Sequence, residues 1–113
     1  MPGQARYIGN AFSLSMIKPP VTVRIEEITA KEFCQEAANS VSAIGHIATA
    51  ELVSRLCGIN IPANRINITL NKGDILFIVQ LMIRLEEGRI LNTEELETLL
   101  NEGKIKFMKV IVE

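Results

Sequence analysis

The sequence predicts a single α/β domain, and three observations support that prediction. The chain has 113 residues, close to the commonest size of one compact domain, and 48% of them are hydrophobic, enough for one core. Segments with apolar residues at alternate positions, typical of strands, are interspersed with segments whose apolar residues recur every three or four positions, typical of helices. We therefore expect residues 1–113 to form one domain, with residues 1–5 as a flexible lead-in.

Strand patterns occur in five places. The segment at residues 75–85 is almost wholly apolar, as expected for a central strand covered on both faces, and Gln80 is its polar exception. We expect Gln80 to be buried, with its amide satisfied either by backbone groups or by a ligand. A hairpin turn at Asn71–Asp74 would join the predicted strands at residues 66–71 and 75–85. The five predicted strands are residues 6–16, 21–26, 66–71, 75–85 and 104–112.

Helix signals occur in three places. Thr29 with Glu32, and Asn92 with Glu95, have the spacing of a capping box, in which each side chain satisfies a backbone N–H group. Gly58 is placed to end the second helix. The predicted helices run from 29 to about 39, from about 44 to 58, and from 92 to 103.

The composition disfavours several classes of protein. Charged residues make up 22% of the chain and the formal net charge is -1, which argues against disorder and against a generally basic nucleic-acid-binding surface. We see no apolar run long enough to span a membrane and no secretion signal, so we expect a cytoplasmic protein. Cys34 and Cys57 lack zinc-like spacing, and we expect no metal site. Buried free thiols are the default expectation; a single bridge is the alternative, as in hyperthermophile cytosols.

The segment from Ser42 to Ala50 contains the only histidine, His46, among small residues at the start of the second predicted helix. The first turn of a helix offers unpaired N–H groups and the positive end of the helix dipole, which suits an anion. The alternative is that His46 only caps or packs the helix start. The pattern therefore indicates a candidate anion site with a candidate general acid.

Other polar residues also occupy positions where a ligand could contact them. Asn10 interrupts the apolar alternation of the first strand, so its amide serves either a turn or a ligand. Arg84 and Glu87 follow the central strand, where functional groups often lie on loops held by a sheet. An exposed ion pair is the alternative for these two residues.

Five segments, taken in order, resemble the small archaeal-virus proteins known as type III anti-CRISPR ring nucleases. They are Asn10-Ala11-Phe12-Ser13, Ser42-Ala43-Ile44-Gly45-His46, Leu56-Cys57-Gly58, Asn64-Arg65 and Arg84-Leu85-Glu86-Glu87-Gly88. The resemblance implies a mixed sheet of about five strands flanked by three helices, in a two-fold homodimer. It also implies that cyclic tetra-adenylate binds across the dimer interface and is cut without metal or cofactor, which antagonises type III CRISPR immunity in the infected cell.

Carried over by position, the resemblance makes His46 the general acid, with Glu87 and Arg84 as its catalytic partners. This chain departs from some members of that family. It has Ile47 where they have Asp or Gln, and it has Ala48, Met82 and Ile83 where some of them have polar residues. The implied ligand-binding residues are Asn10, Ser13, Ala43, Ile44, Gly45, Thr49, Arg65 and Gln80.

These catalytic and ligand-binding residues suit cleavage of a phosphodiester bond as in RNA. In that reaction the 2′-hydroxyl of the substrate attacks the adjacent phosphorus and an acid of the protein protonates the departing 5′-oxygen. The alternative is a non-catalytic dimeric module that sequesters a cyclic nucleotide or binds nucleic acid as a viral regulator. The near-neutral charge argues against stable binding to duplex DNA. A purely structural protein would leave Asn10, Gln80, Arg84 and Glu87 unexplained as a set.

Overall fold

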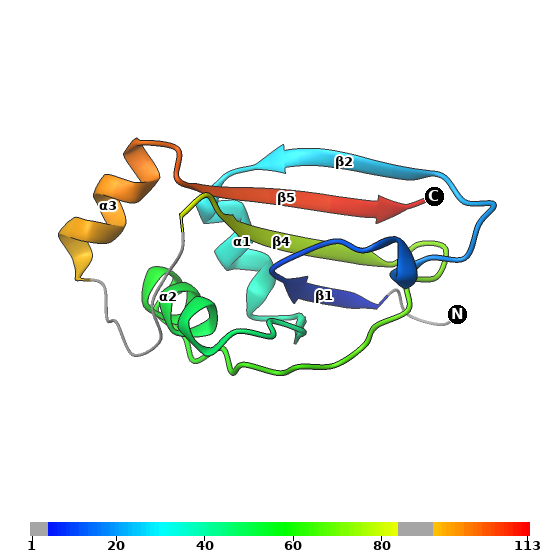
Figure 1. Cartoon of the computed structure of the whole chain (residues 1–113), viewed down its shortest axis with the longest axis horizontal. Helices are drawn as coiled ribbons and strands as arrows, with labels where there is room; N and C mark the ends of the chain where they lie inside the picture. The colour runs from blue at the N-terminus through cyan, green and yellow to red at the C-terminus, as the bar shows by residue number, and fades with distance from the viewer. Residues whose placement is uncertain (1–4, 84–91) are drawn as a thin grey trace.

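The computed structural model describes residues 5–83 and 92–113, which form a five-stranded sheet with three α-helices (Figure 1). The predicted fold class, a single α/β domain with a mixed sheet, is therefore confirmed. The elements are β1 (Arg6–Gly9), the 3-10 helix η1 (Leu14–Met16), β2 (Val23–Ile28), α1 (Ala30–Ala37), β3 (Val41–Ser42), α2 (Ile47–Cys57), β4 (Ile75–Leu81), α3 (Thr93–Asn101) and β5 (Ile105–Val112).

The sheet has the strand order β2-β5-β4-β1-β3 and is mixed. β1 runs parallel to both β3 and β4, with Ile8 opposite Ser42 and Gly9 opposite Ile78, whereas β5 is antiparallel to β4 and to β2. The carboxyl ends of β1, β3 and β4 therefore lie at one edge of the sheet, where ligands of open α/β sheets commonly bind. In Figure 1 this edge is on the left, where α2 and α3 also lie.

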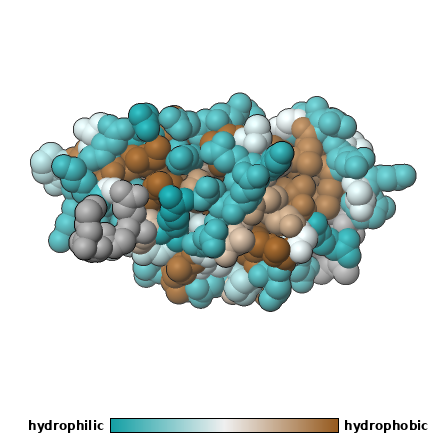
Figure 2. All heavy atoms as spheres, turned by 180° about the vertical axis from the view of Figure 1, so that it is seen from behind, coloured by the Kyte–Doolittle hydropathy of each residue, from teal (hydrophilic) through white to brown (hydrophobic). Residues whose placement is uncertain are grey.

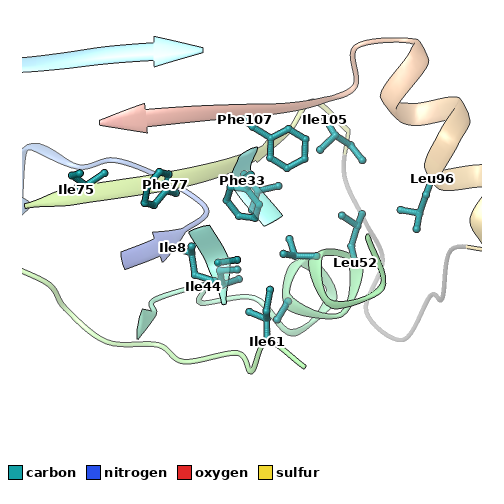
Figure 3. Packing of buried hydrophobic residues seen from close by; sticks show 14 residues of the cluster. Ile8, Phe33, Ile44, Leu52, Ile61, Ile75, Phe77, Leu96, Ile105 and Phe107 are labelled. Carbon is teal, nitrogen blue, oxygen red and sulfur yellow. The ribbon is translucent and has the colours of Figure 1, made fainter. Parts of the chain in front are cut away.

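Two apolar clusters cover the two faces of the sheet. On the first face, side chains of the helices pack against the strands, and the rings of Phe33 from α1 and Phe107 from β5 lie 5.0 Å apart between centroids (Figure 3). On the second face, Ile68 and Leu70 pack with β4 and β5 residues, and irregular segments around Phe12 and Ile17 add to this cluster. β4 lies in the middle of the sheet and its residues 75–79 are buried, which confirms the predicted central strand.

The predicted strand at residues 66–71 is wrong. The apolar alternation does correspond to buried side chains at Ile68 and Leu70, whereas Ile66 is 42% exposed. The segment has no strand structure, and Leu70 N–H donates instead to the Met16 carbonyl at 2.6 Å. An apolar alternation therefore indicates which side chains are buried, but it does not show that the backbone forms hydrogen bonds with a neighbouring strand. The fifth strand is β3, a two-residue edge strand that the sequence pattern did not predict.

The predicted boundaries of other elements also need correction. β1 ends at Gly9, and residues 14–16 of the first predicted strand form η1. Gly73 has a φ of 93° and lies in the predicted turn, but the turn does not join two strands of a hairpin. β4 ends at Leu81, and Gln80 is exposed instead of buried. Residues 1–4 of the predicted lead-in lie outside the described residues, and Ala5 N–H donates to Asp74 Oδ1 at 3.0 Å.

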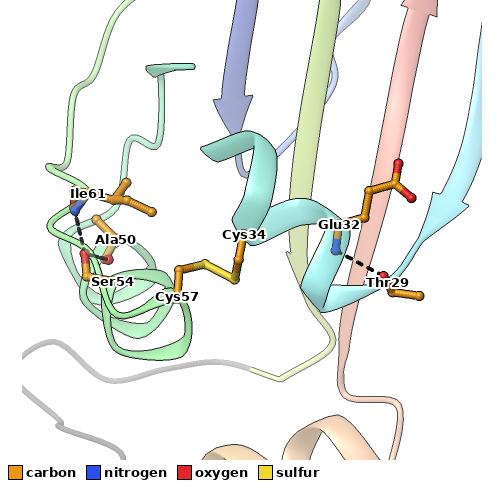
Figure 4. Close-up of a disulfide and its surroundings, with 7 residues drawn as sticks. All are labelled: Thr29, Glu32, Cys34, Ala50, Ser54, Cys57 and Ile61. Carbon is orange, nitrogen blue, oxygen red and sulfur yellow. Dashed lines mark hydrogen bonds between the residues drawn. A yellow bond between two sulfur atoms is a disulfide. The ribbon is translucent and has the colours of Figure 1, made fainter. Parts of the chain in front are cut away.

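The expectation of two free thiols is wrong, because Cys34 and Cys57 form a disulfide with their Cα atoms 5.1 Å apart (Figure 4). The bond joins α1 to the last residue of α2. Figure 4 also shows Ser54 of α2 bonded to Ile61, whose N–H donates to Ser54 Oγ at 2.8 Å. The carboxyl-terminal half of α2 is thus held by a covalent and a polar contact, while its amino terminus faces the carboxyl edge of the sheet. No helix in the two described ranges is long and apolar enough to cross a membrane.

Candidate ligand-binding site

His46 is the N-cap residue of α2 and is exposed. The His46 carbonyl accepts from Ala50 N–H at 3.0 Å, but no side chain caps this helix. Elsewhere in the described chain, α1 is capped by Thr29 and α3 by a capping box at Asn92. The imidazole therefore lies at the positive end of a helix, and it neither packs into the core nor caps the first turn.

Asn10 connects the end of β1 to the loop that precedes His46. Its Oδ1 accepts from Gly45 N–H at 3.2 Å, across 35 positions of sequence. The amide oxygen therefore has a partner within the protein, in the loop before α2, which is one of the two roles expected for Asn10. The bond sets the position of the residue immediately before the histidine.

Arg65 contacts the same glycine from the opposite loop. Its Nη2 donates to the Gly45 carbonyl at 3.3 Å, and the Arg65 side chain is exposed. Both backbone polar groups of Gly45 are thus engaged by side chains, one from Asn10 and one from Arg65. A guanidinium has five N–H donors in a fork, so Arg65 keeps donors available for a phosphate while it makes this bond.

The loop at residues 42–46 is fastened to the loop at residues 62–65 by a small hydrogen-bond network. Ser42 Oγ donates to the Pro62 carbonyl at 2.7 Å, and Asn64 Nδ2 donates to the Ser42 carbonyl at 2.8 Å. Asn64 N–H donates to the carbonyl of Ile44 at 2.8 Å. These contacts hold His46 and Arg65 on one rigid base. The sequence marks Ser42 and Asn64 only as parts of motifs, and it gives no signal that they bond to each other.

The remaining ligand-binding candidates lie in different environments. Ile44 is fully buried and Thr49 is 6% exposed, so neither side chain is on the surface beside His46. Ala43 N–H donates to the Ile8 carbonyl at 2.7 Å and continues the pairing beyond β3. Ser13 caps η1 by accepting from Ser15 N–H at 3.3 Å, and its hydroxyl also lies 3.0 Å from Ser15 Oγ, so these bonds stay within η1 and do not reach the Asn10–Gly45–Arg65 group.

The catalytic partners expected from the resemblance, Arg84 and Glu87, lie outside the described residues. Gln80 lies next to the end of β4, at the same edge of the sheet as Asn10. Ile47, which follows the histidine, is 63% exposed and lines a pocket of about 420 Å³ between α2 and residues 60–63. His46, Asn10 and Arg65 do not line that pocket.

Apolar side chains also reach the surface in several separate elements. Leu14 is 78% exposed, Val41 on the edge strand β3 is 52% exposed, and Met82 is 52% exposed. Figure 2 shows the face turned away in Figure 1, where apolar patches alternate with hydrophilic regions. Scattered apolar exposure of this kind is ordinary for a protein surface, so it does not by itself locate a binding site.

These observations define a class: a small single-domain α/β protein with an exposed histidine at a helix amino terminus, at the carboxyl edge of its parallel strands. The family model described as STIV B116-like matches residues 6–108. The chain therefore belongs to the STIV B116-like family.

Three relatives illustrate the family. The chain is 40% identical over 96 residues to uncharacterized protein 26 of Sulfolobus islandicus filamentous virus, with 80% of each protein covered. It is 47% identical over 66 residues to uncharacterized protein ORF116 of Acidianus filamentous virus 1, covering 58% of this chain and 57% of that protein. The structure is similar to that of B116 of Sulfolobus turreted icosahedral virus, with a TM-score of 0.86, 34% identity, and 95% and 98% of the two chains covered. The resemblance to small archaeal-virus proteins is thus confirmed, and the names of these relatives state no activity.

Proposed function

We propose that this protein is a ring nuclease that binds and cleaves cyclic tetra-adenylate, and that it thereby antagonises type III CRISPR immunity in the cytoplasm of the infected cell. The observation that carries the proposal is the exposed His46 at the uncapped amino terminus of α2, beside the exposed Arg65. A candidate proton donor thus lies beside two kinds of anion-binding group, the helix amino terminus and a guanidinium, and both proton donation and stabilisation of the phosphorane charge favour metal-independent cleavage of a phosphodiester.

The reaction follows from the chemistry of the ring. The 2′-oxygen of one ribose attacks the adjacent phosphorus, a new P–O2′ bond forms, and the P–O5′ bond breaks. His46, acting as general acid, gives a proton to the departing 5′-oxygen, and the 2′-hydroxyl proton passes to a base. The resemblance makes Glu87 a catalytic partner, and we propose its carboxylate for that role. The products are linear adenylates with a 5′-hydroxyl and a 2′,3′-cyclic phosphate.

The α2 amino terminus and Arg65 would stabilise the charge that develops on the phosphorane. Arg84, carried over from the resemblance, would add a second guanidinium. A two-fold homodimer suits the ring, because each protomer supplies one copy of every group to a ligand of four equal units. The proposal therefore includes the dimer as the active form.

The first test is incubation of the purified protein with cyclic tetra-adenylate in the presence of a metal chelator. Conversion of the ring to linear adenylates with 2′,3′-cyclic phosphate ends, resolved by chromatography, supports the proposal. A ring that binds but stays intact at stoichiometric protein favours the non-catalytic sequestering module. A ring that neither binds nor is cut, together with a salt-sensitive shift of nucleic acid in a gel, favours the nucleic-acid regulator.

A further inference from the structure

Two exposed lysines, Lys104 and Lys106, lie beside the carboxyl end of β4. Gln80 lies directly opposite Lys106 of β5, so both side chains are on the same face of the sheet, and both are exposed. The Lys104 carbonyl accepts from Met82 N–H at 2.7 Å, so the pairing extends beyond the strands to a second exposed lysine. Gln80, Met82, Lys104 and Lys106 form what we call the β4–β5 strip.

The strip lies at the same edge of the sheet as the residues around His46. Gly9, the last residue of β1, lies opposite Ile78 of β4. Asn10 follows Gly9 and therefore lies close to the level of Gln80 in β4. The order of strands then places Asn10, Gln80 and Lys106 on three neighbouring strands or their immediate ends. Asn10 in turn bonds to Gly45, the residue before His46.

The positive charge of the strip comes from Lys104 and Lys106. In the two described ranges neither Lys104 nor Lys106 takes part in an ion pair. The acid nearest to Lys106 in register on this face is Glu27, which lies opposite Met108, and the two form no ion pair. Two ammonium groups and an amide beside the carboxyl end of β4 present hydrogen-bond donors suited to phosphate oxygens.

We propose that the β4–β5 strip is a second phosphate-binding subsite for the cyclic ligand, with Lys106 as its main contact. This inference rests on the proposed function. A ring of four phosphates on a two-fold dimer presents two phosphates to each protomer. The α2 amino terminus with Arg65 accounts for one of them, and the strip supplies the donors for the other.

The test compares Lys106→Gln with Lys72→Gln, measuring the Kd for cyclic tetra-adenylate at low and at high salt. Lys72 is also exposed but lies in the turn before β4, at the opposite end of that strand, so it makes a matched control for charge. We expect Lys106→Gln to weaken binding about tenfold, because two symmetric copies each lose one partly exposed phosphate contact. We also expect a smaller salt dependence, wild-type affinity for Lys72→Gln, and recovery in Lys106→Arg.

Equal affinities of wild type and Lys106→Gln would overturn the inference while leaving the proposed function intact, provided that the wild type cuts the ring. Equal weakening by the two glutamine variants would also overturn it, because the effect would then be one of net charge. A wild type that does not bind the ring would overturn both proposals. All variants change exposed side chains, and an unchanged thermal midpoint verifies that each is folded.

Discussion

Asn10 Oδ1 accepts a hydrogen bond from Gly45 N–H at 3.2 Å, and this bond joins the carboxyl end of β1 to the residue before His46. The imidazole itself is exposed and uncapped, so its position depends on the backbone that carries it. Asn10 is therefore a positioning residue for the proposed acid.

Replacing Asn10 should separate this positioning from binding. Asn10→Ala leaves Gly45 N–H without its acceptor, which should cost about 1–2 kcal/mol of stability and loosen the loop before His46. We expect cleavage under single-turnover conditions to fall about tenfold or more, since small misplacements of a reacting group are costly. Asn10→Asp keeps the acceptor, so its stability should match that of wild type while its affinity for the anionic ring falls. Equal cleavage by Asn10→Ala and wild type would contradict the positioning role.

The disulfide should make a large contribution to stability. Cys34 and Cys57 are 23 positions apart, and cross-linking a loop of that length stabilises a fold by about 3 kcal/mol in the chain-entropy model. We expect the Cys34→Ser/Cys57→Ser variant, or the reduced wild type, to unfold at a clearly lower temperature in calorimetry. A thiol count under denaturing, non-reducing conditions should find none. Two titratable thiols per chain in that assay would refute the bridge.

Asp74 should matter for stability and leave ligand binding unaffected. It is 6% exposed, and its two carboxylate oxygens accept from Ala5 N–H at 3.0 Å and Asn71 N–H at 2.8 Å. Asp74→Ala leaves both donors unpaired and should cost about 2–4 kcal/mol in chemical denaturation. Because Asp74 precedes β4, at the end of the strand opposite to Gln80, the affinity for cyclic tetra-adenylate should stay unchanged below the unfolding transition. A selective loss of affinity would show that this end of the sheet also contributes to the site.

Glycine is not required at position 45 by backbone strain or by crowding. A Cβ added there would lie 3.8 Å from Arg65 Nε and 3.9 Å from its Cγ, which is ordinary contact. We therefore expect Gly45→Ala to fold with nearly wild-type stability in thermal unfolding. Any loss should appear in the affinity for the ring, because the added methyl group lies against Arg65. A severely destabilised Gly45→Ala protein would mean that the loop tolerates no side chain.

Local signals in the sequence predicted the helices well. The capping residues Thr29 and Asn92 bond to backbone groups three positions away, so adjacent residues carry all the needed information. The central strand was equally accessible, because a continuous apolar run reflects burial on both faces. His46 was placed correctly at the start of α2 by the helical periodicity that follows it.

Features that depend on distant contacts were not accessible in the same way. Residues 66–71 alternate like a strand because Ile68 and Leu70 pack onto a sheet face, while their backbone pairs with no strand. The Asn10–Gly45 bond and the Cys34–Cys57 bridge join positions that only the fold brings together. Gln80 was expected to be buried by analogy with its apolar neighbours. The face of β4 that it shares with Leu76 and Ile78 is no longer covered at Gln80, although Leu81 still packs partly against the cluster on the other face.

The most direct test of the proposed function is a comparison of wild type with His46→Ala for binding and for single-turnover cleavage of cyclic tetra-adenylate, with Gln35→Ala as an exposed control on α1. We predict that His46→Ala binds the ring with a Kd close to that of wild type and cuts it about 100 to 10,000 times more slowly, as expected for loss of a general acid. Gln35→Ala should match wild type in both. Cleavage by His46→Ala at the wild-type rate would contradict the central claim.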